Sequence, residues 1–223
     1  MDPSNIVIRI CINAIPLILA ITLHEAAHGY VAKMLGDNTA YMMGRVTLNP
    51  AKHIDPVGTI AFPLISMIIG GVLFGWAKPV PVNFGNLRHP KRDMFWVAAA
   101  GPGSNIVQAL LWAAIAKAIL MSEPSSMAAT FWIYVAVAGI RWNVILAIFN
   151  LFPILPLDGG RIVTSLLPNR LAYSYSTLEP YGMPILIGLI VLMVAYEPLG
   201  QQFQALIDGG QYVFYSLFGL NSR

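Results

Sequence analysis

The sequence predicts an all-α polytopic membrane protein with a three-helix core, an extra C-terminal span, short membrane-associated β segments and a re-entrant element. Of its 223 residues, 57% are hydrophobic and only 10% are charged, and its mean hydropathy is +0.68. Soluble domains carry about 25% charged residues. The net charge of +3 is modest and its basic residues are spread over loops, which argues against a nucleic-acid partner and for the lipid bilayer. The length suits a single domain over residues 1–223.

The first core helix is expected over residues 5–35, which are apolar as far as Leu23 and amphipathic beyond it. The 18-residue step from Ile6 to His24 corresponds to about 27 Å of helix. Because a hydrocarbon core is about 30 Å thick, residues 24–28 should lie just inside the far face of the membrane. Gly36 is expected to end this helix.

Two short stretches favour extended backbone. Residues 40–50 alternate loosely between apolar and polar, which predicts a short strand or a hairpin that ends at Asn49-Pro50. Farther along, Val80, Val82 and Phe84 alternate with prolines, and the prolines forbid a helix.

The basic residues decide the orientation of the chain. Lys and Arg occur in loops 36–55, 76–92 and 157–182 but not in loop 122–130, so the first three are expected in the cytosol. Loops 36–55 and 76–92 share a side only if residues 56–75 enter the membrane and return, and Pro63, Gly70 and Gly71 supply the necessary breaks. A plain spanning helix over 56–75 is the alternative.

Further helices complete the predicted architecture. Two more core helices are expected over residues 93–121 and 131–152, so the core covers about residues 5–170. An additional C-terminal span should begin at Tyr181 and end at Glu197. The aromatic, amphipathic tail after it, residues 199–220, is expected at the membrane interface and closes the C-terminal region 181–223.

A metal-binding motif, HExxH, lies at the end of the first core helix. His24 and His28 are four residues apart and therefore share one helix face, where both imidazoles can bind one zinc ion. Glu25 stands beside them as a carboxylate that can take a proton from a metal-bound water.

A third ligand is needed, because a catalytic zinc normally has three protein ligands and a water. Asp158 is the best candidate, since Pro153 and Pro156 break the preceding helix and two glycines allow a tight turn after it. The charge argument places Asp158 at the same cytosolic side as the two histidines. A helix-capping or loop carboxylate is the alternative.

Three motifs occur in a telling order: HEAAH in the first core helix, AAAGPGSN in the second and NLFPILPLDGG at the end of the third. Together they resemble the site-2 protease family of intramembrane zinc metalloproteases, over roughly residues 5–170. The segments GRVTLNPAKHIDPVGT and GWAKPVPVN resemble a compact prokaryotic subgroup. Larger members carry a PDZ or CBS domain, and neither fits in 223 residues.

The resemblance implies one Zn²⁺ per chain, held by His24, His28 and Asp158, with Glu25 as the general base. It implies that Asn150 lies near the metal and helps to hold substrate or the oxyanion. It also implies regulated intramembrane proteolysis: the partner is the transmembrane segment of a membrane-protein substrate, cut within or near the bilayer. The expected location is a prokaryotic cell membrane, with the site toward the cytosol.

Other residues are expected to bind the substrate or to support the site. The segment with Val80, Val82 and Phe84 could capture an unwound substrate by β-addition. His53 lines the site or, as the commoner alternative, makes a loop hydrogen bond. Asn105 either ties the second core helix to the loop of Asp158 or simply packs between helices.

Two rival functions remain open from the sequence. A membrane zinc-binding or zinc-transport protein could also use intramembrane His and Asp, although transport has no need of Glu25. A structural membrane scaffold would make the metal motif accidental. Glu25→Gln discriminates between a protease and a zinc transporter, because only the protease would lose its activity.

Overall fold

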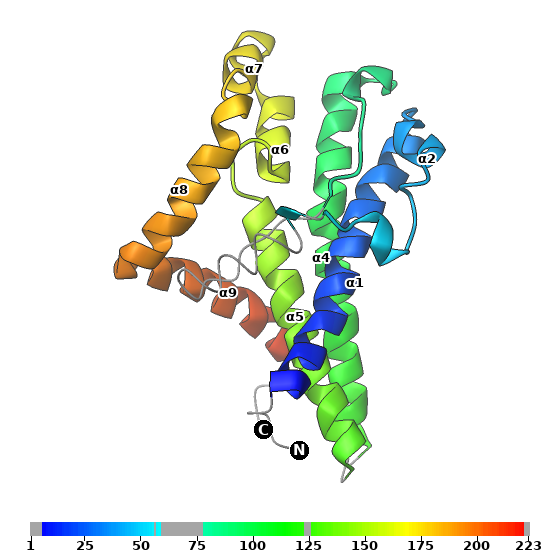
Figure 1. The fold of residues 1–223 in the computed structure, drawn as a ribbon, viewed down its shortest axis with the longest axis vertical. Helices are drawn as coiled ribbons and strands as arrows, with labels where there is room; N and C mark the ends of the chain where they lie inside the picture. The colour runs from blue at the N-terminus through cyan, green and yellow to red at the C-terminus, as the bar shows by residue number, and fades with distance from the viewer. Residues whose placement is uncertain (1–5, 56, 59–77, 123–125, 221–223) are drawn as a thin grey trace.

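The computed structural model describes residues 6–55, 57–58, 78–122 and 126–220, and these residues are mostly helical (Figure 1). Its longer helices are α1 (Ile6–Met34), α4 (Pro90–Met121), α5 (Met127–Asn150), α8 (Gly182–Ala195) and α9 (Glu197–Phe218). Shorter helices are α2 (Thr39–Met42), α6 (Asp158–Leu166) and α7 (Asn169–Ser176), and 3₁₀ turns lie at Pro50–Lys52, Phe84–Asn86 and Glu179–Tyr181.

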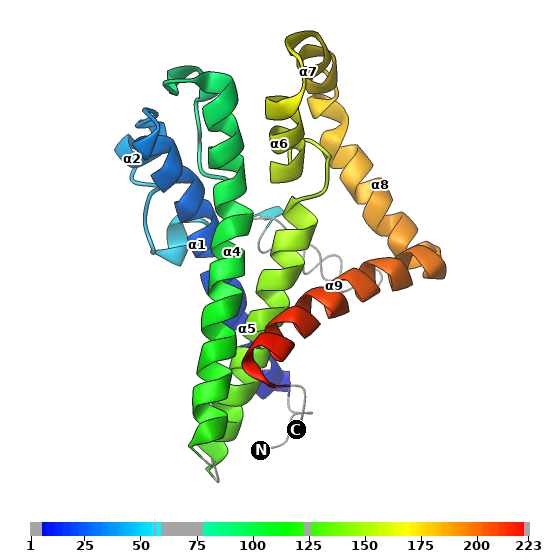
Figure 2. The same cartoon turned by 180° about the vertical axis from the view of Figure 1, so that it is seen from behind.

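Four helical segments are long and apolar enough to cross a membrane: Val7–Met34, Pro90–Met121, Met127–Asn150 and Asn169–Ala195. The first three are α1, α4 and α5, the expected core helices, and they run side by side along the long axis (Figures 1 and 2). The fourth contains α8, the expected C-terminal span. The chain is therefore a multi-pass membrane protein, as its composition predicts.

Two apolar clusters hold the core helices together. One joins Ile12 of α1 to Val135 and Ala138 of α5. The other joins α4 and α5 to Ile207 of α9, and Figure 2 shows α9 lying obliquely across α5. Burial of such side chains against one another fixes the helix positions from which the site is built.

The prediction of β structure is wrong for the part of the chain that the structure describes, where no strand occurs. Residues 40–42, the start of the expected strand or hairpin, instead belong to α2. The reason lies in Asp37, whose Oδ1 accepts hydrogen bonds from Thr39 N at 3.1 Å and Thr39 Oγ1 at 2.5 Å. Such local side-chain bonds compete with strand pairing and turn the chain.

The segment around residue 80 follows its prediction only in part. Residues 78–83 are not helical, as the prolines require, but they pair with no strand in the described structure, and Phe84 starts a 3₁₀ turn. The prediction of a re-entrant element over 56–75 lies outside the described residues. The residues flanking that stretch are in contact, since Lys78 N donates to His53 O at 2.9 Å.

Two helix boundaries bear on the site. α1 ends at Met34 and is followed by Gly36 at φ +117°, a conformation that glycine adopts without strain. The stretch 157–182, expected as a loop, instead forms α6, α7 and a 3₁₀ turn. α2, α6 and α7 lie at one end of the molecule, opposite the junction between α4 and α5 (Figure 1).

Candidate metal centre

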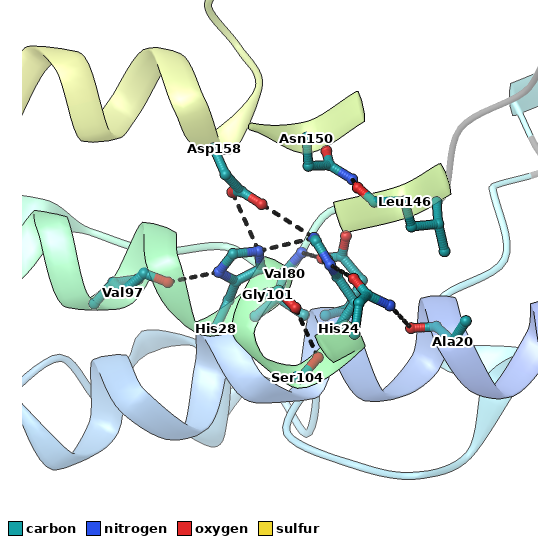
Figure 3. A network of polar contacts seen from close by, with 12 residues as sticks. Ala20, His24, His28, Val80, Val97, Gly101, Ser104, Leu146, Asn150 and Asp158 are labelled. Carbon is teal, nitrogen blue, oxygen red and sulfur yellow. Dashed lines mark hydrogen bonds and ion pairs between the residues drawn. The ribbon is translucent and has the colours of Figure 1, made fainter. Parts of the chain in front are cut away.

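α1 brings its two histidines together, one helical turn apart. The Nε2 atoms of His24 and His28 are 3.1 Å apart (Figure 3), and the residues are 6% and 9% exposed. Both rings face α4, where Gly101 leaves room for them: a Cβ there would lie 2.4 Å from His28 Nε2 and 2.6 Å from His24 Nε2. A glycine at this position therefore lets α4 approach the imidazoles.

Asp158 completes the group from the opposite side (Figure 3). Its Oδ2 lies 3.2 Å from His24 Nε2 and its Oδ1 lies 3.2 Å from His28 Nε2. Residues 151–157 are not helical, so the helix break expected at Pro153 and Pro156 is present. The tight turn expected at the two glycines is wrong, because Asp158 is the first residue of α6. The glycines instead allow the start of α6 to pack closely against the preceding loop, because a Cβ on Gly159 would lie 2.2 Å from Leu151 O.

The other ring nitrogens of the histidines face oxygen atoms. His28 Nδ1 lies 2.7 Å from Val97 O, and a carbonyl oxygen can only accept, so His28 Nδ1–H is the donor. His24 Nδ1 lies 2.6 Å from Asn105 Oδ1. Second contacts of this kind orient metal-binding imidazoles and leave Nε2 as the ligand atom.

The three ligand atoms fit a zinc ion. Ligands at 2.0–2.1 Å from a tetrahedral zinc are separated by about 3.3 Å. The two Nε2 atoms are 3.1 Å apart, and each lies 3.2 Å from a different oxygen of Asp158. With one ligand atom taken from each residue, the three atoms lie within 4.8 Å of one another. The buried Asp158 Oδ2 has no hydrogen-bond donor among the described residues. Within that part of the chain, His24, His28 and Asp158 form the one group of three residues that could hold a metal ion.

The charge of Asp158 suits this role. Burial acts to raise the pKa of its carboxyl, but attraction to positive charge on the adjacent His28 outweighs burial and lowers the pKa to about 2. The group is thus a carboxylate at neutral pH, the form that binds a cation.

Glu25 lies in the same cavity, which has a volume of about 750 Å³. Its Oε2 accepts a hydrogen bond from Val80 N at 2.7 Å. Val80, Val82 and Phe84 also line the cavity, as does Asn150. The structure therefore gathers the predicted base and the predicted substrate-binding residues around the two histidines.

Asn150 has its own hydrogen bond, from Nδ2 to Leu146 O at 3.0 Å. This bond uses one of the two amide hydrogens, so the second hydrogen can still serve an oxyanion and Oδ1 can still accept from a substrate. Arg161 was missed by sequence reasoning: it lines the cavity, pairs with Glu179 and stands 5.4 Å from the ring centroid of Phe84.

Of the two residues expected to support the site, Asn105 contacts a candidate ligand and His53 does not line the cavity. His53 does not line the cavity, and its Nε2 lies 3.0 Å from Thr47 O, the loop hydrogen bond that was the alternative. Asn105 contacts His24 and Asn143, not the loop of Asp158. Sequence reasoning also missed the role of Gly101, although the small-residue run that contains it was a usable signal.

Fold and site together define a class: a polytopic membrane protein with a largely buried His-His-Asp group that could hold a metal ion, and an adjacent carboxylate. The model of Peptidase family M50 matches residues 114–194. A Bacillus subtilis protein named "Putative zinc metalloprotease YwhC" is 36% identical, with 92% of this chain and 91% of that protein covered. No match was found among solved structures.

Two mycobacterial proteins named "Putative zinc metalloprotease Rip2" are also similar. The one from Mycolicibacterium smegmatis is 27% identical and the one from Mycobacterium tuberculosis H37Rv is 28% identical; each match covers 92% of this chain and 73% of the relative. The chain belongs to peptidase family M50, the site-2 protease family. It is a membrane zinc metalloprotease, which sets aside the transporter and scaffold alternatives.

Proposed function

We propose that this chain, as one domain, hydrolyses peptide bonds within or near the transmembrane segment of membrane-protein substrates. The observation that carries the proposal is the meeting of His24, His28 and Asp158 beside Glu25, in a cavity lined by spanning helices. The proposed membrane is that of a prokaryotic cell. The proposed side is cytosolic, because the basic loops and the ends of the helices that carry the site fall at one end of the molecule.

We assign the zinc ligands to His24 Nε2, His28 Nε2 and one oxygen of Asp158. When bound, zinc lowers the pKa of a coordinated water and polarises the scissile carbonyl. Glu25 then takes the proton of that water and passes it to the leaving amine. The hydrogen bond from Val80 N fixes one oxygen of this carboxylate and leaves the other free to move a proton.

The strap, residues 78–87, is the proposed wall of the substrate cleft. Val82 and Phe84 give it an apolar surface toward the cavity, while Met183 and Leu186 of α8 line the same cavity. A substrate helix must unwind before attack, because its carbonyls are otherwise occupied by hydrogen bonds. Asn150, whose Oδ1 can accept, would hold an amide hydrogen of the unwound strand in this arrangement.

Cleavage of single-span model proteins, reconstituted with the purified chain in lipid vesicles, tests the proposal. Mass spectrometry of the products should place the cut inside or at the edge of the hydrophobic segment. The zinc chelator 1,10-phenanthroline should abolish the cut, and added zinc should restore it. Cuts confined to soluble flanking regions, or cuts that persist after chelation, would contradict the proposal.

A further inference from the structure

A buried chain of two amides leads away from the metal centre into the helix bundle. Asn105 of α4 and Asn143 of α5 are both 0% exposed. Asn105 Nδ2 donates to Asn143 Oδ1 at 2.9 Å, and Asn105 Oδ1 lies 2.6 Å from His24 Nδ1. Buried polar groups at membrane depth are costly unless each is paired, so this arrangement calls for an explanation.

Main-chain carbonyls fix the direction of every bond in the chain. Asn143 Nδ2 donates to Gly139 O at 2.9 Å, and that oxygen can only accept. Asn143 must therefore present Oδ1 to Asn105. Asn105 Nδ2 donates one hydrogen to that Oδ1 and its second hydrogen to Ala20 O at 3.3 Å. With both hydrogens so used, Asn105 presents only an acceptor, Oδ1, to His24.

We propose that Asn105 and Asn143 form an amide relay that keeps His24 in the Nδ1–H tautomer and so presents a bare Nε2 to the metal. Flipping either amide would set two oxygens against each other, Asn105 Oδ1 against Ala20 O or Asn143 Oδ1 against Gly139 O. Asn143 is therefore a positioning residue that acts on the zinc ligand through Asn105. The inference rests on the proposed assignment of His24 as a ligand.

The relay also explains why His24 needs two asparagines when His28 needs none. His28 Nδ1 reaches a main-chain carbonyl, Val97 O, directly. His24 faces the side-chain amide of Asn105, which can turn over unless something prevents it. Asn143 is that constraint, because it faces Asn105 from α5 and is itself tied to Gly139.

Nuclear magnetic resonance of the zinc-free, full-length protein tests the relay directly. The chain has four histidines, so ¹⁵N-histidine labelling gives a small spectrum, and a His24→Ala variant identifies the His24 peaks. We expect His24 as the Nδ1–H tautomer in the wild type. We expect a mixture of tautomers in Asn143→Leu, with zinc affinity reduced by about 10- to 100-fold.

Asn13→Leu is the matched control. Asn13 Oδ1 accepts from Trp142 Nε1 at 3.0 Å, so this variant also removes a hydrogen bond that an asparagine makes between two core helices, but one outside the relay. It should change neither the tautomer nor the zinc affinity. An Nε2–H tautomer of His24 in the wild type overturns the relay, and needs no variant to fold. So does an Asn143→Leu protein with unaltered tautomer and affinity.

The same experiment separates the relay from the proposed metal centre. Zinc binding by the wild type together with the wrong tautomer would overturn the relay alone. Failure of the wild type to bind zinc would overturn both, because the centre itself would then be misassigned.

Discussion

At the residue scale, the metal centre depends as much on small side chains as on its ligands. Gly101 stands where any Cβ would press on both imidazoles. Neighbouring helices in membranes often approach through such small residues. Here the space between α1 and α4 is occupied by the two histidine rings, so glycine serves the site as well as the packing.

Gly101→Ala should displace one or both imidazoles and reduce zinc affinity by at least roughly tenfold, with an overpacking cost of about 1–3 kcal/mol. Gly103→Ala is the matched control, because a Cβ at Gly103 meets nothing within 4 Å. Chelator competition in detergent measures the zinc affinity of both variants. Equal affinities would contradict the steric role of Gly101.

Asp37 shows how one buried carboxylate anchors two loops. It accepts from Asn83 N at 2.7 Å and from Asn86 Nδ2 at 3.1 Å, besides its bonds to Thr39. Burial acts to raise the pKa of its carboxyl, but the hydrogen bonds from Thr39, Asn83 and Asn86 lower the pKa below its ordinary value. Because the folded-state pKa is depressed, the stabilisation is present above the unfolded pKa, about 3.9. It is lost as the pH falls through the folded-state value.

Asp37→Asn should therefore lower the thermal unfolding temperature at pH 6, and the difference from wild type should shrink as the pH falls below about 3.9. Thermal unfolding of both proteins in detergent, at several pH values from 6 to 3, measures this difference in unfolding temperature. Asp208→Asn, which replaces an exposed carboxylate of α9, should show no such trend. A difference that stays constant or grows toward low pH would contradict the assignment.

At the element scale, the strap is held across α1 at both of its ends. Near its start, Arg45 Nη2 donates to Lys78 O at 2.8 Å and to Pro79 O at 3.2 Å. Near its end, Asp37 receives hydrogen bonds from Asn83 and Asn86. Between these anchors, Val80 N reaches Glu25. The strap thus couples the wall of the cleft to the orientation of the proposed base.

Arg45→Ala should loosen this anchor, misplace Glu25 and lower kcat by roughly tenfold to a hundredfold. Zinc content should stay near that of the wild type, because Arg45 contacts no ligand residue. Lys52→Ala, a change at an exposed cation farther along the same loop, serves as the control. Loss of zinc in Arg45→Ala, or an unchanged kcat, would count against this role of the strap.

The sequence predicts elements well where length and composition decide. The four spans follow from apolar runs, and the two histidines and Asp158 follow from their motifs. The sequence-based prediction fails where a few hydrogen bonds determine the local structure. The alternation over residues 40–50 does not reveal the Asp37–Thr39 hydrogen bonds at the start of α2. Likewise, Asn105 and Asn143 are 38 residues apart, and only the packing of α4 on α5 reveals that they meet.

At the scale of the whole molecule, α1, α4 and α5 form a bundle. The proposed metal centre lies where α1 and α4 of this bundle meet the start of α6. In the proposed centre, α1 would supply two ligands and α6 the third, while α4 supplies the oxygen contacts behind the histidines. This division makes the centre a product of tertiary packing, so α1 alone could not form it. The ends of the bundle differ in charge, which predicts the orientation.

Cysteine labelling tests the proposed orientation. In a Cys11→Ser background, which removes the one native thiol, an impermeant maleimide should label Ser122→Cys in intact prokaryotic cells. Arg170→Cys, on α7 at the opposite end, should be labelled only after the membrane is permeabilised. The reverse pattern would place the metal centre toward the outside.

The most direct test of the account compares metal content and cleavage in the wild type and Glu25→Gln. Because Glu25 is assigned as the base and not as a ligand, both proteins should hold one zinc per chain. Only the wild type should cleave a single-span model substrate, with Glu25→Gln reduced at least about a hundredfold. Loss of zinc in Glu25→Gln, or undiminished cleavage by it, would contradict the assignment at the centre of the account.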